Sequence, residues 1–95
     1  MEIQLSDIVR ALAGRDKGKL FFVVGQKEGY ALLADGKSRR AETPKRKKLK
    51  HLRLERRSDC KTAQKICSGE KVTNGELRRA LAEYSQEPGE GKEGM

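Results

Sequence analysis

Aromatic side chains are scarce in this chain of 95 residues, where they make up 4% of the sequence and tryptophan is absent. Proteins that read single-stranded nucleic acids stack the bases on exposed aromatic rings. Only Phe21, Phe22, Tyr30 and Tyr84 are available, and a core needs most of them. The scarcity of rings therefore argues against a base-stacking reader of single strands.

The residue types that build metal and catalytic sites are also few. Two cysteines, Cys60 and Cys67, are too few for a disulfide scaffold. Together with the single histidine, His51, they offer three candidate zinc ligands, whereas structural zinc sites need four at closer spacings. His51 also lies among lysines without an obvious carboxylate partner for acid–base catalysis. We therefore expect no enzyme activity, no metal and no cofactor.

Long apolar runs are absent as well. The longest, residues 20–24, is far too short to cross a bilayer. The first residues include the acids Glu2 and Asp7 and no apolar stretch of signal-peptide length. We therefore expect a cytoplasmic protein without membrane contact, whose cysteines stay reduced.

Positive charge is in excess, and it is concentrated in one segment. The 22 lysines and arginines outnumber the 14 acids and give a net charge of +8. Residues 37–57 hold eleven of these basic side chains against two acids, Glu42 and Glu55. Such an excess favours a polyanionic partner, most commonly a nucleic acid. The alternative is a solvated surface loop that has no fixed partner.

Alternating and apolar segments predict strands on both sides of this basic segment. We expect strands over residues 8–13, 20–24, 30–34 and 51–55, with turns at 14–18 and 26–29 and a hairpin turn at Asp35-Gly36. Residues 20–24 are apolar on both faces, as in a strand of a small barrel or one covered by another element. Residues 37–48 contain Pro44 and lack an apolar period, so we predict a long basic loop with at most a short strand at 39–42. Held between strands and rich in arginine forks that grip phosphate, this loop differs from a free charged tail.

The last third of the chain predicts helices. Asp59 is placed to cap a short helix over residues 61–67 that ends at Gly69. Thr73 and Glu76 have capping-box spacing, and the helix predicted over residues 74–85 gathers its apolar side chains on one face. These are Leu77, Ala80, Leu81 and Tyr84. The chain thus divides into a domain over residues 1–57 with the basic loop at 37–50, a helical extension over 58–85, and a tail over 86–95 that we expect to be disordered.

The stretch over residues 8–34, I-V-R-A-L-A-G-R-D-K-G-K-L-F-F-V-V-G-Q-K-E-G-Y-A-L-L-A, resembles a KOW motif. Gly18, after Arg15 and Lys17, takes the central glycine position in the basic turn. The pattern is similar to bacterial KOW-domain RNA-binding proteins, which in turn resemble KOW-class large-subunit ribosomal proteins of archaea and eukaryotes. Ala34 stands where many relatives have valine before Asp-Gly. The following K-x-R-R and P-K-R-K-K-x-K-H-L also look like this family, so that the resemblance covers about residues 5–56.

The resemblance implies a mainly β fold, a small SH3-like barrel of the KOW type, here followed by one or two C-terminal helices. It also implies contact with RNA, often ribosomal RNA. We further expect a protein that is a monomer when free and that also contacts ribosomal proteins. The charge distribution singles out the basic loop, and the resemblance adds the turn before it. The RNA-binding residues expected from the two together are Arg15, Lys17, Lys19, Lys37, Arg39, Arg40, Lys45, Arg46, Lys47, Lys48, Lys50 and His51.

The family has a second branch, whose KOW domains dock on polymerase or ribosomal protein. A protein-docking module in transcription or translation is therefore the alternative function. That alternative predicts an exposed apolar patch, whereas RNA binding predicts a continuous basic face. Lys71, Arg78 and Arg79 have acids nearby in sequence, so we expect them to matter less.

Overall fold

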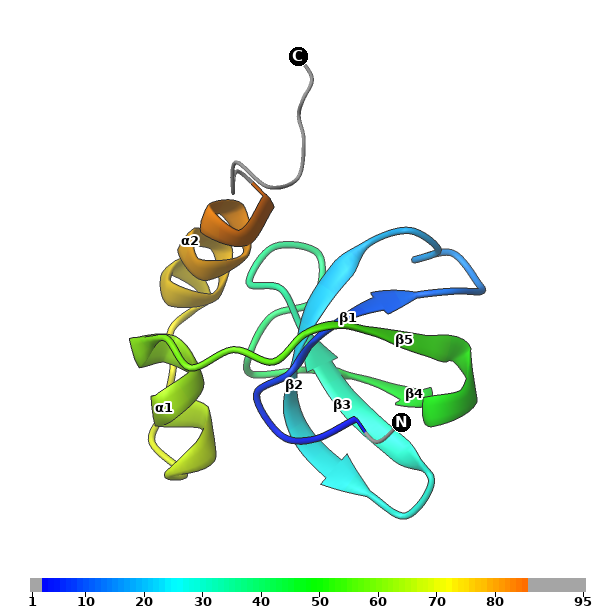
Figure 1. The fold of residues 1–95 in the computed structure, drawn as a ribbon, viewed down its shortest axis with the longest axis horizontal. Helices are drawn as coiled ribbons and strands as arrows, with labels where there is room; N and C mark the ends of the chain where they lie inside the picture. Colours follow the sequence, from blue (N-terminus) through cyan, green and yellow to red (C-terminus); the bar gives the residue numbers. More distant parts are fainter. Residues whose placement is uncertain (1–2, 86–95) are drawn as a thin grey trace.

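The computed structural model describes residues 3–85, and these form an antiparallel sheet followed by two helices. The strands are β1 (Ile8–Ala11), β2 (Leu20–Lys27), β3 (Tyr30–Ala34), β4 (Lys45–Lys48) and β5 (Leu52–Arg56), in the spatial order β4-β3-β2-β1-β5. A 3-10 turn, η1 (Leu49–His51), joins the two edge strands β4 and β5. The mainly β, barrel-like fold is confirmed, although the sheet curls without closing between β4 and β5 (Figure 1).

Strand β2 has a buried apolar side chain on each face, as its sequence predicts. Phe21 and Val23 belong to the core inside the curled sheet. Phe22 faces the other way, into a second core between the sheet and the helices. Both helices lie on that outer side of the sheet (Figure 1). The helical extension therefore completes the fold by covering a sheet face that would otherwise be exposed.

The helices are α1 (Lys61–Cys67) and α2 (Asn74–Ser85), and the start of α2 confirms the predicted capping box. The Glu76 backbone N–H donates to Thr73 Oγ1 at 3.1 Å, and the Thr73 N–H donates to Glu76 Oε1 at 2.9 Å. Leu77 and Leu81 are buried on the predicted face. The predicted cap of α1 is wrong: the N-cap residue is Cys60, not Asp59, and it makes no side-chain capping bond.

Two sequence predictions for the middle of the chain are also wrong. Asp35-Gly36 does not close a tight hairpin; it opens a loop over residues 35–44, which we call the β3–β4 loop. Asp35 Oδ1 accepts the backbone N–H groups of Lys37 and Arg39 and so folds this loop back on itself. The basic loop predicted over residues 37–48, with at most a short strand at 39–42, ends at residue 44, because residues 45–48 form strand β4 instead.

Residues 45–48 form a strand because the aliphatic parts of the lysine side chains can pack beside apolar residues of β3. Lys45 lies opposite Leu33 and Lys47 opposite Ala31, two residues buried in the inner core. The aliphatic stems of such lysines cover apolar surface while their charged ends reach water. Pairing along β3 therefore outweighs the polar composition. His51, expected in a strand, lies in the 3-10 turn.

Glu55 ties three elements together at the outer side of the sheet. It accepts hydrogen bonds from Arg10 of β1 (Nε, 2.9 Å), Arg53 of β5 (Nη2, 2.6 Å) and the Tyr84 hydroxyl of α2 (3.1 Å). The hydrogen bond from Arg10, aided by those from Arg53 and Tyr84, lowers the pKa of Glu55 to about 2 against the effect of burial. Glu55 thus stays ionised at neutral pH and anchors α2 to the sheet.

We therefore expect the contribution of Glu55 to the stability of the protein to be lost at acid pH. Because the pKa of Glu55 is lower in the folded than in the unfolded protein, its contribution is present above the ordinary value of 4.5 and is lost as pH falls to about 2. We expect Glu55→Gln to lower the free energy of unfolding by about 1–3 kcal/mol at pH 7. Urea unfolding at pH 7 and pH 3 measures this, and an equal loss for the variant at both pH values would contradict it.

Within residues 3–85, no helix has the length and apolar character needed to cross a membrane. The predicted disordered tail, residues 86–95, lies outside the described residues.

Candidate nucleic-acid interface

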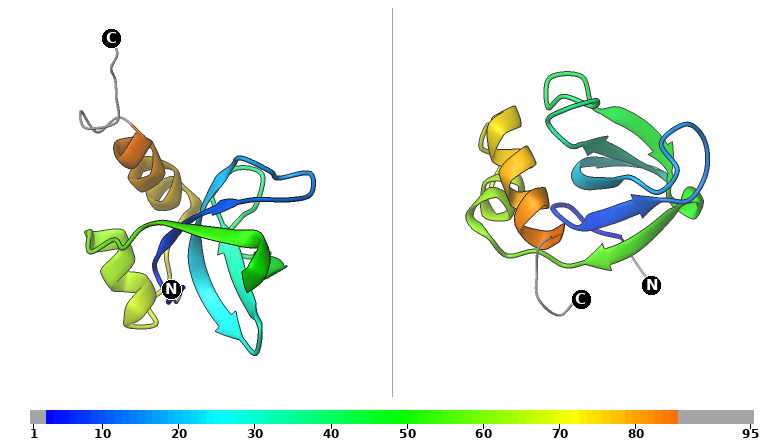
Figure 2. Two further views of the ribbon diagram at one scale, coloured as in Figure 1. Left: turned by 45° about the vertical axis from the view of Figure 1, so that its right-hand side comes forward. Right: turned by 90° about the horizontal axis from the view of Figure 1, so that it is seen from above.

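The turn between β1 and β2, residues 12–19, lies along the basic segment on the side where the sheet is open. The Leu12 N–H donates to the His51 carbonyl oxygen at 2.8 Å, and Lys47 Nζ donates to the Ala13 carbonyl oxygen at 2.7 Å. Further along, Arg39 Nη2 lies 2.9 Å from Asp16 Oδ2. Successive turn residues thus meet positions 51, 47 and 39 in reverse order, so the turn runs beside β4 and the β3–β4 loop (Figure 2).

Asp16 is the anion that holds this arrangement together. Its side chain is 6% exposed and pairs with Arg39, while Lys19 Nζ approaches Asp16 Oδ1 at 3.8 Å. Burial by itself would raise the pKa of Asp16, but the hydrogen bond and charge of Arg39, with the charges of Lys19 and Lys45, lower it. Asp16 is therefore ionised at neutral pH, and it draws cations from the turn, the β3–β4 loop and β4 to one place.

Strand β4 carries its charges on two sides. Lys45 and Lys47 are half-buried and face the turn, whereas Arg46 and Lys48 are exposed on the opposite side, as alternation along a strand requires. The Arg46 guanidinium carbon lies 5.1 Å from the centre of the Tyr30 ring. The predicted residues therefore do not form one flat patch. They wrap around the edge of the sheet at β4.

The predicted RNA-binding residues differ in how much of each reaches solvent. Those that are exposed are Arg15, Lys17, Lys19, Lys37, Arg40, Arg46, Lys48 and Lys50; those that are half-buried are Arg39, Lys45, Lys47 and His51. Arg40 is partly neutralised by Glu42, whose carboxylate lies 3.7 Å from it. We call the exposed and half-buried set together the basic face.

Two arginines outside the predicted set reach the same region. Arg10 Nη1 donates to the Gly18 carbonyl oxygen of the turn at 2.8 Å. Arg78 Nη1 of α2 donates to the Gly36 carbonyl oxygen of the β3–β4 loop at 2.7 Å. The helical period offered a signal for Arg78, because it places Arg78 beside the buried Leu77 and Leu81 rather than on the far side. Arg10 lies in the strand predicted just before the turn, but the sequence does not show that its side chain reaches back to a carbonyl of the turn.

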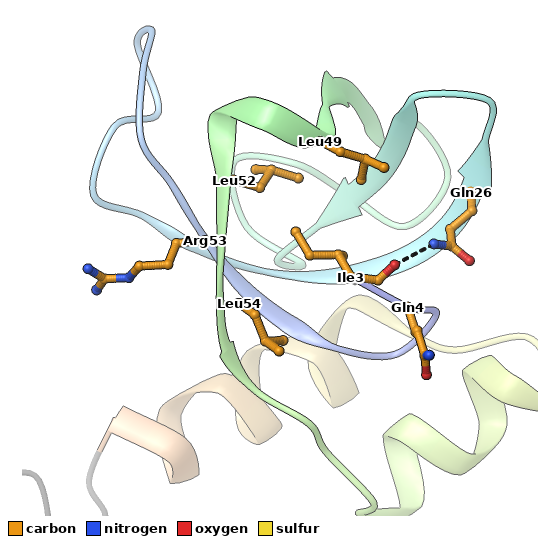
Figure 3. A pocket seen from close by; sticks show the side chains of 7 residues that line it. All are labelled: Ile3, Gln4, Gln26, Leu49, Leu52, Arg53 and Leu54. Carbon is orange, nitrogen blue, oxygen red and sulfur yellow. Dashed lines mark hydrogen bonds between the residues drawn. The ribbon is translucent and has the colours of Figure 1, made fainter. Parts of the chain in front are cut away.

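The described residues expose little of the apolar surface that a docking module needs. At one end of the curled sheet, a cavity of about 540 Å³ is lined by Ile3, Gln4, Gln26, Leu49, Leu52, Arg53 and Leu54. Ile3, Leu49 and Leu52 gather in it, and Gln26 Nε2 bonds to the Ile3 carbonyl oxygen at 2.8 Å, whereas Arg53 points away (Figure 3). Among the described residues, Leu12 is the one large apolar side chain that is exposed, at 43%.

Among residues 3–85, no three His, Cys, Asp or Glu side chains are grouped so as to hold a metal ion. Searches against known protein families and against curated proteins find no match to this chain.

Proposed function

We propose that this protein binds structured RNA, most naturally ribosomal RNA, by gripping backbone phosphates with the basic face. The observation that carries the proposal is the contact of the turn with β4 and the β3–β4 loop. It brings cations from three separate parts of the chain onto one folded surface. Fixed cations on a folded surface neutralise phosphates and fix the position of the backbone without reading sequence.

The aromatic side chains support contact with phosphates over contact with bases. Phe21 and Phe22 are buried, and the Tyr30 ring is covered by Arg46. Little aromatic surface thus remains for stacking. The resemblance of residues 8–34 to the KOW motif supports ribosomal RNA as the target. The proposal places the protein in the cytoplasm, as a monomer before it binds.

A protein-docking module is the second candidate, because the cavity around Ile3, Leu49 and Leu52 could take an apolar side chain of a partner. The basic face favours RNA over this candidate. The docking function requires a broad apolar patch, whereas the described surface has the single exposed leucine, Leu12.

Crosslinking in cells, followed by sequencing of the bound RNA, tests the proposal. We expect ribosomal RNA to be recovered, with crosslinks clustered at structured regions that share no sequence motif. A variant with Lys17→Glu and Lys48→Glu, expressed at the same level, should recover far less RNA because it reverses two exposed charges of the basic face. Recovery of ribosomal proteins without crosslinked RNA would favour the docking function instead.

A further inference from the structure

A groove next to the basic face joins it to the C-terminal helix. The groove has a volume of about 970 Å³ and lies between the turn, the start of the β3–β4 loop and α2. Its cationic lining residues are Arg10, Lys19, Lys37 and Arg78, and its apolar ones include Leu20 and Leu81. Lys19 and Lys37 also belong to the basic face, so the groove continues that face onto α2.

The β3–β4 loop holds the side chain of Arg78, the cation that α2 contributes to the groove. The Arg78 bond to the Gly36 carbonyl oxygen uses one of the five N–H groups of the guanidinium. The remaining N–H groups can form the paired hydrogen bonds that arginine makes with phosphate. Arg78 therefore does not need to be ordered when a ligand binds, which lowers the entropic cost of binding.

The acid that lines the groove, Asp35, is engaged in hydrogen bonds within the β3–β4 loop. Asp35 Oδ1 accepts the backbone N–H groups of Lys37 and Arg39, and Oδ2 lies 3.1 Å from the Ser38 hydroxyl. These bonds use the carboxylate to shape the loop. The same loop conformation carries the Lys37 side chain, which is exposed and lines the groove.

We propose that this groove binds a backbone phosphate of the RNA, so that α2 forms part of the interface through Arg78. The inference rests on the proposed RNA-binding function and extends it to a residue of the helical extension. The sequence predicted that Arg78 and Arg79 would both matter less for RNA binding. The proposal reverses that expectation for Arg78 and keeps it for Arg79. Arg79 is absent from the lining of the groove; it lines a second hollow together with Glu76 and Glu83, which Arg78 also borders.

Three single variants test this inference: Arg78→Gln, Lys37→Gln and the matched control Arg79→Gln, each of which removes one positive charge. We expect each groove variant to weaken binding to a ribosomal RNA fragment about tenfold and to lower the salt slope by about one unit. The control should bind like the wild-type protein. Thermal unfolding of each variant shows whether a loss of binding comes from a loss of folded protein.

The outcomes separate the groove from the rest of the proposal. If the wild-type protein binds RNA with a steep salt dependence but both groove variants bind equally well, the groove is wrong and the basic face stands. If Arg78→Gln weakens binding while Lys37→Gln does not, Arg78 acts by supporting the loop, and the phosphate site is again wrong. If the wild-type protein binds no RNA, the proposed function itself is wrong.

Discussion

Gly36→Ala should destabilise the protein by roughly 3 kcal/mol or more. Gly36 is buried with a φ of 77°, a left-handed conformation that costs other residues about 1–2 kcal/mol. A Cβ at this position would also overlap the backbone carbonyl of Asn74 at the start of α2. Relieving such an overlap in a packed region costs about 1–3 kcal/mol more. Urea unfolding of the wild-type protein and the variant measures the difference.

Gly29→Ala is the matched control for this substitution. Gly29 has a similar φ of 73°, but a Cβ there would meet nothing within 4 Å. We therefore expect it to show the conformational cost alone, about 1–2 kcal/mol. Equal losses of stability in the two variants would mean that the β3–β4 loop does not depend on α2. A larger loss for Gly36→Ala would support the close packing of the loop against the helix.

The second large effect is a steep dependence of RNA affinity on salt. If the basic face contacts six or more phosphates, affinity for a structured ribosomal RNA fragment should fall about 10³-fold between about 50 and 200 mM salt. The reason is that each neutralised phosphate releases condensed counterions, and added salt opposes that release. Titrations over this range measure the slope. A nearly flat salt dependence would favour the docking function over phosphate contact.

Features set by neighbouring residues were predictable from the sequence. The apolar run at residues 20–24 has side chains suited to two cores, and the structure provides both. The pair Thr73 and Glu76 predicted the start of α2, because a capping box is closed by groups three residues apart.

Features that depend on distant residues were not predictable in the same way. The tight hairpin expected at Asp35-Gly36 is replaced by a longer loop that α2 supports: the Asn74 amide oxygen accepts the Ala41 N–H at 2.7 Å, and Arg78 bonds to Gly36. The basic residues of β4 form a strand because β3 offers them a partner.

The candidate site shows the same division. Charge counting found the basic segment, and the family resemblance added the turn. Their contact depends on Asp16, a buried acid that looks unremarkable in the sequence of a charged turn. The division of β4 into two sides depends on its being a strand, which the polar composition of residues 37–48 does not predict. Long-range pairing therefore decides which of the predicted cations act together.

The most direct test of phosphate contact by the basic face is the salt slope of three double variants, each lacking two positive charges. Lys17→Ala with Lys19→Ala alters the turn, Arg46→Ala with Lys48→Ala alters β4, and Lys61→Ala with Lys71→Ala alters exposed lysines of the helical extension as a control. We predict that the slope for structured RNA falls by about two units in the first two variants and is unchanged in the third. Equal slopes in all three variants, or a loss confined to the third, would contradict the proposed RNA-binding face.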